Sequence, residues 1–314
     1  MYWPYLNMRQ QELLALVRVA PRVAGTRLIV PIIRPVTVSV RSHGQVIRVA
    51  QAGHRVALIT NPGNGPRPNS IMAELSAMPG SPVLPTIELR NDVTRSDVAS
   101  FSARYAGQRC VVIHRDHGFT PAALDGLLGG AAGNAIHVFV DGEGPDLPAT
   151  YTPRGNHRVL VRNGFRACAP NGAYPPQSGF GGLAFSYSAN GWSGFGDFAT
   201  VGDNPIVPTG GGPANHHAFH LTETVRRPTV VCHHFVSTVR TNAGDRAKYQ
   251  DSLRLLTAHV GTPPRVPFRT LGVDAFLATR GSGSALAPPK GFSIAHHVEM
   301  LHDVISSAGA VPFV

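Results

Sequence analysis

The segment from Gln108 to Gly118 reads QRCVVIHRDHG and has the pattern of a buried strand that ends in polar residues. Four apolar residues, Cys110 to Ile113, lead directly into a cluster of imidazole and charged side chains that begins at His114. A short continuous apolar run is typical of a strand covered on both faces, as in a parallel sheet flanked by helices. Because α/β sheets carry their chemistry at the carboxyl ends of their strands, the cluster marks a candidate site.

The same pattern recurs through the first half of the chain. The apolar segments predicted to be strands span 27–35, 55–60, 81–89, 110–113 and 135–140. The polar residues at their ends, spaced by 27, 27, 26 and 27 residues, are Arg34, Asn61, Glu88, His114 and Asp141. A strand of about five residues, a helix of about ten and two short loops fill such an interval. Five consecutive βα units predict a parallel sheet, and a closed TIM-barrel-like (β/α)8 fold is the economical arrangement.

Helical periodicity fills the intervals between the predicted strands. The predicted helices span 10–24, with an interruption near Pro21, and then 41–53, 70–78, 95–105 and 121–128. After Asp141 the units become irregular. We predict strands six, seven and eight at 157–162, 196–201 and 229–236. An extra strand or hairpin arm is expected at 217–222, and two closing helices are expected at 245–260 and 294–305. No linker divides the chain, so we expect one domain over 1–314 with a long loop insertion at about 165–195.

Composition places the chain among globular proteins with a basic balance. Of its 314 residues, 43% are hydrophobic and 15% charged, which excludes a disordered chain. The formal net charge is +10, and only Lys248 and Lys290 of the 28 basic residues are lysines. A basic chain can bind nucleic acid or a smaller anion, but the abundance of Arg, Ala, Gly and Pro also fits a coding bias, and no basic helix stands out.

The cysteines and the apolar segments bear on the compartment. Cys110, Cys168 and Cys232 are an odd number, and two of them lie in strand-like runs, which favours reduced, buried thiols. The opening MYWPYLNMRQQE lacks the pattern of a signal peptide. No apolar run approaches the roughly 20 residues that span a bilayer. These features predict a cytoplasmic protein without a membrane partner.

Several short motifs resemble the Beta-protein family of uncharacterised bacterial and phage proteins, in particular a smaller bacterial branch of it. The motifs are MYWPYLNMRQQELLAL at the start, RLIVPIIRP at 27–35, GDF at 196–198, CHHFVS at 232–237 and SIAHHVEML at 293–301. The resemblance implies a TIM-barrel-like fold and no settled activity, so it assigns no catalytic residues. The family more often has an acid at the position of Arg34, which removes a role for an acid at that strand end here.

The polar residues at the predicted strand ends are the candidates for chemistry, since the carboxyl ends of barrel strands share one mouth. They are Arg34, Asn61, Glu88, His114, Arg115, Asp116, Asp141, Glu143, Asp197, His233 and His234. Because side chains alternate along a strand, we expect His114 and Asp116 to share a face and to do acid–base work, together with Asp141. Arg34 and Arg115 would bind an anionic group, with help from Asn61. The alternative is an internal ion-pair network that satisfies buried polar groups.

Two further features could add a ligand to this site. The turn TGGGP at 209–213 follows the seventh predicted strand, and the backbone of Gly210 and Gly211 could cradle a phosphate, although a plain flexible loop has the same composition. Histidines are frequent in the last third of the chain. Asp197 with His233 or His234 could hold a divalent metal ion with an open position for water, but no H-E-x-x-H or C-x-x-C pattern is present. Only one of the two adjacent histidines can point inward.

These residues support two function hypotheses of different classes. The first is a hydrolase, with or without a metal ion, that acts on a phosphate ester or nucleotide-like anion at the barrel mouth. The second is a non-catalytic binding or scaffold subunit that recognises a partner protein or nucleic acid, for instance in phage–bacterium conflict. Its recognition surface would be aromatic residues of the long loop, which otherwise cover the barrel mouth or fill a small core of their own. They are Phe180, Phe185, Tyr187, Trp192 and Phe195.

Overall fold

The computed structural model describes residues 1–36, 39–140, 157–203, 215–226, 229–239, 245–261, 269–280 and 287–312. Eight parallel strands close into a barrel in the order β1-β2-β3-β4-β5-β6-β7-β9. They are β1 (Tyr2–Asn7), β2 (Ile32–Arg34), β3 (Val56–Ile59), β4 (Val83–Leu89), β5 (Val111–His114), β6 (Ile136–Val140), β7 (Arg158–Arg162) and β9 (Gly194–Asp197). Parallel pairing of β1 with β9 closes the ring. The predicted TIM-barrel-like fold is therefore confirmed.

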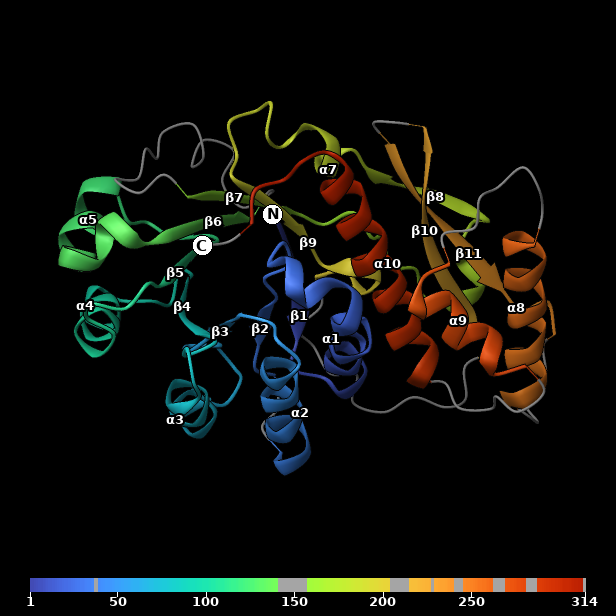
Figure 1. Cartoon of the computed structure of the whole chain (residues 1–314), viewed down its shortest axis with the longest axis horizontal. Helices are drawn as coiled ribbons and strands as arrows, with labels where there is room; N and C mark the ends of the chain where they lie inside the picture. The colour runs from blue at the N-terminus through green and yellow to red at the C-terminus, as the bar shows by residue number, and fades with distance from the viewer. Residues whose placement is uncertain are drawn as a thin grey trace.

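Helices connect the first six strands and cover the outside of the barrel (Figure 1). They are α1 (Gln10–Val23), α2 (Val40–Gln51), α3 (Asn69–Ala77), α4 (Arg95–Arg104) and α5 (Pro121–Leu128). Side chains of Ser39, Thr94 and Thr120 cap the amino ends of α2, α4 and α5 by accepting a backbone hydrogen bond. The interruption expected near Pro21 is wrong, because Pro21 lies inside the last part of α1 and the helix continues to Val23.

The barrel begins one strand earlier than predicted. Tyr2 to Asn7 forms β1, so the segment predicted as the first strand is β2, shortened to three residues between Pro31 and Pro35. At the other end, the apolar run at 229–236 is not the eighth barrel strand. It forms β11 (Thr229–Val236), which pairs antiparallel with β10 (Ala218–Arg226) and β8 (Gln177–Gly181) in a separate three-stranded sheet. The interval predicted as a long loop contributes β8 and the short helix α7 (Leu183–Ser186).

The three-stranded sheet has a hydrophobic cluster of its own. Phe219, Leu221 and Phe235 of the sheet pack with residues of α8 (Asp245–Val260) and α9 (Leu271–Ala278). The last helix, α10 (Ala287–Ser307), lies between this sheet and the barrel and contacts α1, α9 and β10 (Figure 1). No helix within the described residues is long and apolar enough to cross a lipid bilayer.

Alternation along the barrel strands separates an inner and an outer layer of side chains. Trp3, Ile32, Ile59 and Ile113 belong to the cluster that fills the barrel. Their neighbours along the strands, among them Leu58 and Val112, belong to the cluster between barrel and helices. Since the period is two residues, this alternation decides which polar residue at each strand end faces the mouth.

Candidate functional site

Five inward-facing residues at the mouth are separated by one constant interval. They are Asn7, Arg34, Asn61, Glu88 and Arg115, each 27 residues after the one before. Four of them follow an apolar inward residue of their strand by two positions, for example Ile113 before Arg115, and Glu88 follows the buried Thr86 in the same way. The constant interval therefore places one polar side chain per βα unit at the mouth of the barrel.

A network of charge-assisted hydrogen bonds joins the five residues to Asp203, which follows β9. Arg34 donates to Asn7 Oδ1 over 3.0 Å and to Asp203 Oδ1 over 2.9 Å. Arg115 donates to Glu88 Oε1 over 2.6 Å and to Asp203 Oδ2 over 2.7 Å. Each arginine therefore holds one oxygen of the same carboxylate by a charge-assisted hydrogen bond.

Aromatic rings and burial hold these charges in place. The Tyr5 hydroxyl donates to Glu88 Oε1, and the guanidinium carbons of Arg34 and Arg115 lie 5.0 and 5.4 Å from the Tyr5 ring centroid. Burial by itself would lower the pKa of both arginines, but Tyr5, Glu88 and Asp203 outweigh it and raise the pKa. Burial likewise raises the pKa of Asp203, and the two arginines reverse that effect and hold it below its usual value. Arg34, Arg115 and Asp203 therefore stay ionised when buried.

A cavity of about 530 Å³ opens beside this network. Its walls come from the loops after β2, β3 and β4, and Arg34, Glu88, Arg90 and Asp92 line it. Arg90 donates to Glu88 Oε2 over 3.0 Å and so joins the network to the cavity. Gly65 brings two loops together, because a Cβ atom there would lie 2.0 Å from the Pro35 carbonyl oxygen. The volume is in the range of small-molecule sites.

His114 does not face the mouth, and the expected pairing with Asp116 is wrong. The His114 ring lies outside the barrel and stacks on Phe139 at 4.4 Å between centroids. It shares hydrogen bonds with His117 over 3.0 Å and His137 over 2.9 Å. Burial, together with His137 and His117, lowers its pKa well below the usual value. Both ring nitrogens are committed, so His114 has no atom left for acid–base work at the mouth.

The backbone fixes the tautomers of this histidine chain. The Phe119 amide donates to Nδ1 of His117, so the proton of a neutral His117 ring sits on Nε2 and is donated to His114. His114 then donates from Nε2 to Nδ1 of His137. Asp116 is exposed and accepts from the Asn91 side chain over 2.6 Å. The chain fastens β5 to β6, and the carboxylate of Asp116 takes no part in it.

Of the residues predicted to bind an anion, two arginines lie together at the mouth, and the others either have a different role or lie outside the described residues. Arg34 and Arg115 lie together at the mouth, as described. The Asn61 side chain donates to the Glu88 carbonyl and accepts from the Glu88 amide, both over 2.9 Å, so it positions Glu88 and is itself satisfied. The other predicted residues, Asp141, Glu143, Gly210 and Gly211, lie outside the described residues.

Asp197 faces α10 and not the mouth. It lies two residues after Phe195, which belongs to the outer layer, and it accepts from the Tyr2 hydroxyl over 2.7 Å. His297 on α10 contacts both carboxylate oxygens at 3.1 Å, and its other nitrogen shares a hydrogen bond with Thr222. Thr222 is 1% exposed. The hydrogen bonds of this Thr–His–Asp series connect α10, β9 and β10.

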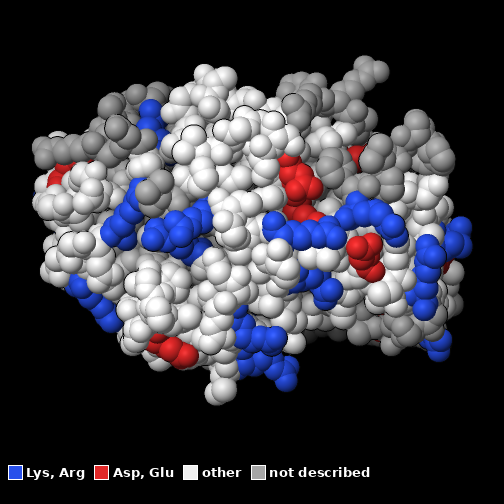
Figure 2. All heavy atoms as spheres, in the orientation of Figure 1, with Lys and Arg blue, Asp and Glu red and all other residues white. Residues whose placement is uncertain are grey.

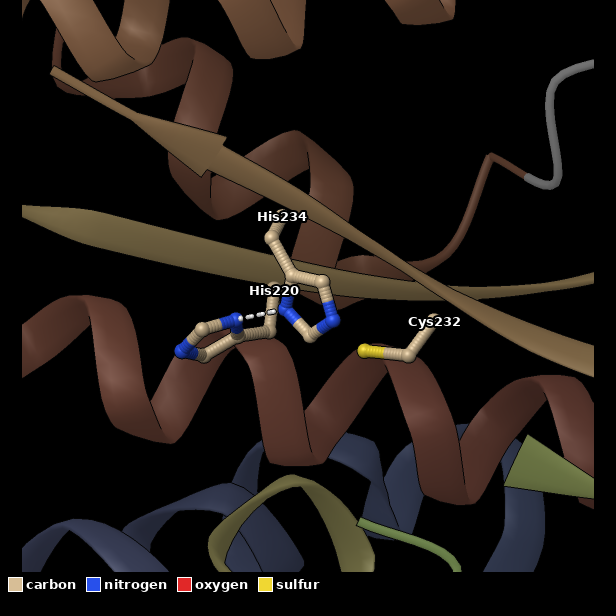
Figure 3. Close-up of side chains that lie close together, drawn as sticks. All are labelled: His220, Cys232 and His234. Atoms are coloured by element: carbon tan, nitrogen blue, oxygen red, sulfur yellow. Dashed lines mark hydrogen bonds between the residues drawn. The ribbon is translucent and has the colours of Figure 1, made fainter. Parts of the chain in front are cut away.

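The structure does not bring His233, His234 and Asp197 together as one metal site. Both histidines lie on β11, outside the barrel, and point to opposite faces of the three-stranded sheet. His234 lies near His220 and Cys232, and the two imidazoles share a hydrogen bond of 2.8 Å (Figure 3). His233 lies near Glu223 and His259 on the other face. Among the described residues, neither candidate group of metal ligands includes Asp197.

The aromatic residues of the predicted loop are packed, and they do not cover the mouth. Tyr187 and Phe195 are buried, and Phe180, Phe185 and Trp192 pack against the main core. Three of them, Phe185, Tyr187 and Trp192, line a cavity with Met1, which lies at the amino end of β1 and thus at the opposite end of the barrel. On the face shown in Figure 2, basic side chains form separate groups with uncharged and acidic surface between them, so this face offers no continuous basic surface.

Sequence reasoning missed four residues of the mouth: Tyr5, Asn7, Arg90 and Asp203. Asn7 could have been found by extending the 27-residue interval back from Arg34. Tyr5 could then have been found two residues before Asn7, and Arg90 two residues after Glu88, because residues two apart along a strand point to the same side. Asp203 has no such signal, since it lies in irregular chain after β9.

The fold and the site together define a (β/α)8 barrel with an arginine-rich mouth. No protein-family model and no curated protein sequence matches the chain. Among solved structures, it is similar to a Coccidioides immitis protein described as belonging to the dihydrodipicolinate synthase family, with 10% sequence identity, a TM-score of 0.33 and 52% of this chain covered. The match spans 59% of that protein. A similarity this low carries no argument, and the fold rests on the strand pairing.

Proposed function

We propose that this chain is an enzyme that binds a phosphate ester or nucleotide-like anion at the carboxyl-end mouth of the barrel and hydrolyses it. The observation that carries the proposal is the clamp of Arg34 and Arg115 on the two oxygens of Asp203. A substrate phosphate or carboxylate that displaced Asp203 would find both guanidinium groups already placed and already desolvated. Such preorganisation removes part of the free energy that ordering the site would otherwise cost.

Arg90 and Glu88 complete the proposed site. Arg90 lines the cavity beside Arg34, so a second part of an extended anion can lie against it. Glu88 is the buried carboxylate that borders the same cavity, and it takes over the role of general base that the sequence suggested for His114. A general base has to reach the attacking water directly or through one other water. Glu88 lines the cavity, so a water bound there would lie on its side of the substrate.

Membership of the Beta-protein family and a cytoplasmic location remain part of the proposal. The family motifs coincide with elements that build the barrel and its contacts, since MYWPYLN contains β1, IIR is β2 and HH at 296–297 lies on α10. Arg34 stands where the family more often has an acid, which suits a site that binds anions.

The test is turnover of phosphomonoesters, phosphodiesters and nucleoside phosphates by the purified full-length chain. Glu88→Gln keeps the size of the side chain and should lose at least about a hundredfold in kcat, the scale of a general base. His114→Phe is the matched control. It should retain kcat within about threefold, because its ring lies outside the barrel. A hundredfold loss in the His114 variant with an active Glu88 variant would place the chemistry elsewhere and contradict the proposal.

A non-catalytic anion-binding subunit is the second candidate. It is favoured by one feature of the mouth, namely that Glu88 is ion-paired with both Arg90 and Arg115, which weakens it as a base. The two candidates share the binding step and differ in turnover. Saturable binding of a nucleotide with no product after prolonged incubation would select the second.

A further inference from the structure

The hairpin of β10 and β11 carries a group of possible metal ligands on each face. The face toward α8 holds Glu223 of β10, His233 of β11 and His259 of α8. The opposite face holds His220, Cys232 and His234 (Figure 3). None of these residues belongs to the barrel mouth, and the proposed hydrolase does not use them.

On the α8 face, two imidazoles converge on one carboxylate oxygen. Nε2 of His233 lies 2.9 Å from Glu223 Oε2, and Nε2 of His259 lies 3.2 Å from the same oxygen. The two rings lie 4.2 Å apart between centroids. Nitrogen and oxygen donors that share one ion at 2.0–2.2 Å lie about 3.0–3.5 Å from one another, so both distances to Oε2 are close to those of a ligand set.

The direction of the His233 nitrogen distinguishes a ligand set from a hydrogen-bonded pair. In a hydrogen bond the N–H vector points at the acceptor, whereas ligands of one ion point at a third position between them. Nε2 of His233 is buried and makes no hydrogen bond with any described residue, although it lies 2.9 Å from Oε2. The residue is 8% exposed, so water does not easily replace the missing partner. A lone pair directed at an ion would satisfy this atom.

We propose that Glu223, His233 and His259 bind a divalent transition-metal ion, with Zn²⁺ as the preferred ion. Two imidazoles and one carboxylate are a ligand set that Zn²⁺ accepts, with a fourth position for water. The side chains of Glu223 and His259 are partly exposed, at 24% and 18%, so an ion can enter from solvent beside the more buried His233. The ion would connect α8 to the hairpin, because one ligand comes from the helix and two come from the strands.

The opposite face is less suited to an ion because its donors are already used. Nδ1 of His234 shares a hydrogen bond of 2.8 Å with His220 (Figure 3). Nε2 of His234 shares one of 2.9 Å with Ser178. An ion there would break both of these hydrogen bonds. On the α8 face it would replace the one between His259 and Glu223 and would satisfy the buried Nε2 of His233.

The experiment is titration of Zn²⁺ into metal-depleted full-length protein, prepared without a histidine tag, by isothermal calorimetry. The wild type should bind one equivalent with a dissociation constant that is micromolar or lower. Loss of a group that only supports a ligand weakens metal binding by up to about a hundredfold. Loss of a ligand should weaken it at least as much, so we expect at least about a hundredfold weaker binding in both Glu223→Gln and His233→Gln. His220→Gln and Cys232→Ser, on the other face of the same hairpin, are the matched controls and should bind like the wild type.

Cobalt(II) gives an independent readout, and its absorption spectrum can be recorded on the wild-type protein. Co²⁺ bound by Glu223, His233 and His259 should show d–d absorption without a thiolate-to-cobalt charge-transfer band. A strong charge-transfer band, or loss of binding in Cys232→Ser with full binding in Glu223→Gln, would move the ion to the other face and overturn the proposal. Absence of any Zn²⁺ binding by the wild type would overturn it as well.

Discussion

At the barrel mouth, Arg34 and Arg115 are buried as cations, because Glu88 and Asp203 compensate the loss of water. In the three-stranded sheet and on α10, His220 and His296 are buried as neutral rings, because burial lowers their pKa to about 3 and about 4. Both regions bury polar side chains. At the mouth these side chains are ionised, whereas in the histidine-rich region the buried imidazoles are neutral. The mouth therefore holds two guanidinium groups in place as cations, whereas the neutral imidazoles are sensitive to acid.

Lowering the pH should cause the largest loss of folding stability, because it protonates the buried neutral histidines. Burial lowers the pKa of His54 and His296 from 6.5 to about 4. The unfolded chain therefore takes up protons on these rings below about pH 6.5, while the folded chain does so only near pH 4. Stability is constant above that window and falls within it, by up to about 3 kcal/mol for each ring.

With His220 included, this loss is comparable with the whole stability of an ordinary domain. Urea unfolding followed by circular dichroism at pH 7.5, 6.5, 5.5 and 4.5 checks it. The pH dependence at pH 5.5 should correspond to uptake of more than one proton on unfolding. Asp203 contributes to stability in a lower pH range. Because its ion pairs with Arg34 and Arg115 lower its pKa, this contribution is present above about pH 4 and is lost below it. A flat profile from pH 7.5 to pH 4.5 would contradict the contrast between the regions.

Breaking the charge network should have the next largest effect. Glu88→Gln removes the most buried carboxylate of the network and leaves Arg115 paired only with Asp203 and Arg90 only with Asp92. Removal of one partner of a buried pair costs about 3–5 kcal/mol. Asp92→Asn is the matched control, because Asp92 also pairs with Arg90 but is 65% exposed. Exposed pairs contribute about 0–1 kcal/mol. Denaturant unfolding at pH 7.5 gives both values, and equal losses would mean that the mouth network is not buried as described.

The smallest effects compare single hydrogen bonds of the two regions. Asn7→Ala removes the acceptor for the Arg34 Nε–H group and should cost about 1.5–3 kcal/mol, because the bond involves a charge. Ser178→Ala removes a neutral bond to His234 and should cost about 0.5–1.5 kcal/mol. Thermal and urea unfolding of both variants measure the difference. A larger loss in Ser178→Ala would indicate that the sheet, and not the mouth, carries the stronger polar interactions.

Much of the barrel could be predicted because apolar runs and their spacing are local properties. The runs before Asn61, Glu88 and His114 each mark a strand, and a 27-residue unit follows from the lengths of its parts. β1 was missed because Pro4 interrupts its pattern and no unit precedes it. The run TVVCHHFV has the composition of a barrel strand, and sequence alone does not say that it pairs with β10 instead.

The site was less predictable because it depends on which way a side chain points. His114 and Arg115 are neighbours, and the choice between them is set by the alternation along β5. A strict interval of 27 residues from Glu88 selects Arg115, whereas the imidazole drew attention to His114. Asp197 shows the same error, since the residue at the end of β9 faces α10. Asp203 and the approach of α8 to β11 depend on tertiary packing, which leaves no periodic signal.

The most direct test of the central claim is calorimetric binding of pyrophosphate, at one low ionic strength, to the wild type and to Asp203→Asn. If Asp203 occupies the place of an anionic ligand between Arg34 and Arg115, the variant keeps the arginines and loses the competing charge. Its affinity for pyrophosphate should then rise at least about tenfold, which corresponds to about 1.4 kcal/mol. Equal or weaker binding by Asp203→Asn would mean that this carboxylate belongs to the architecture of the mouth and does not stand in for a ligand.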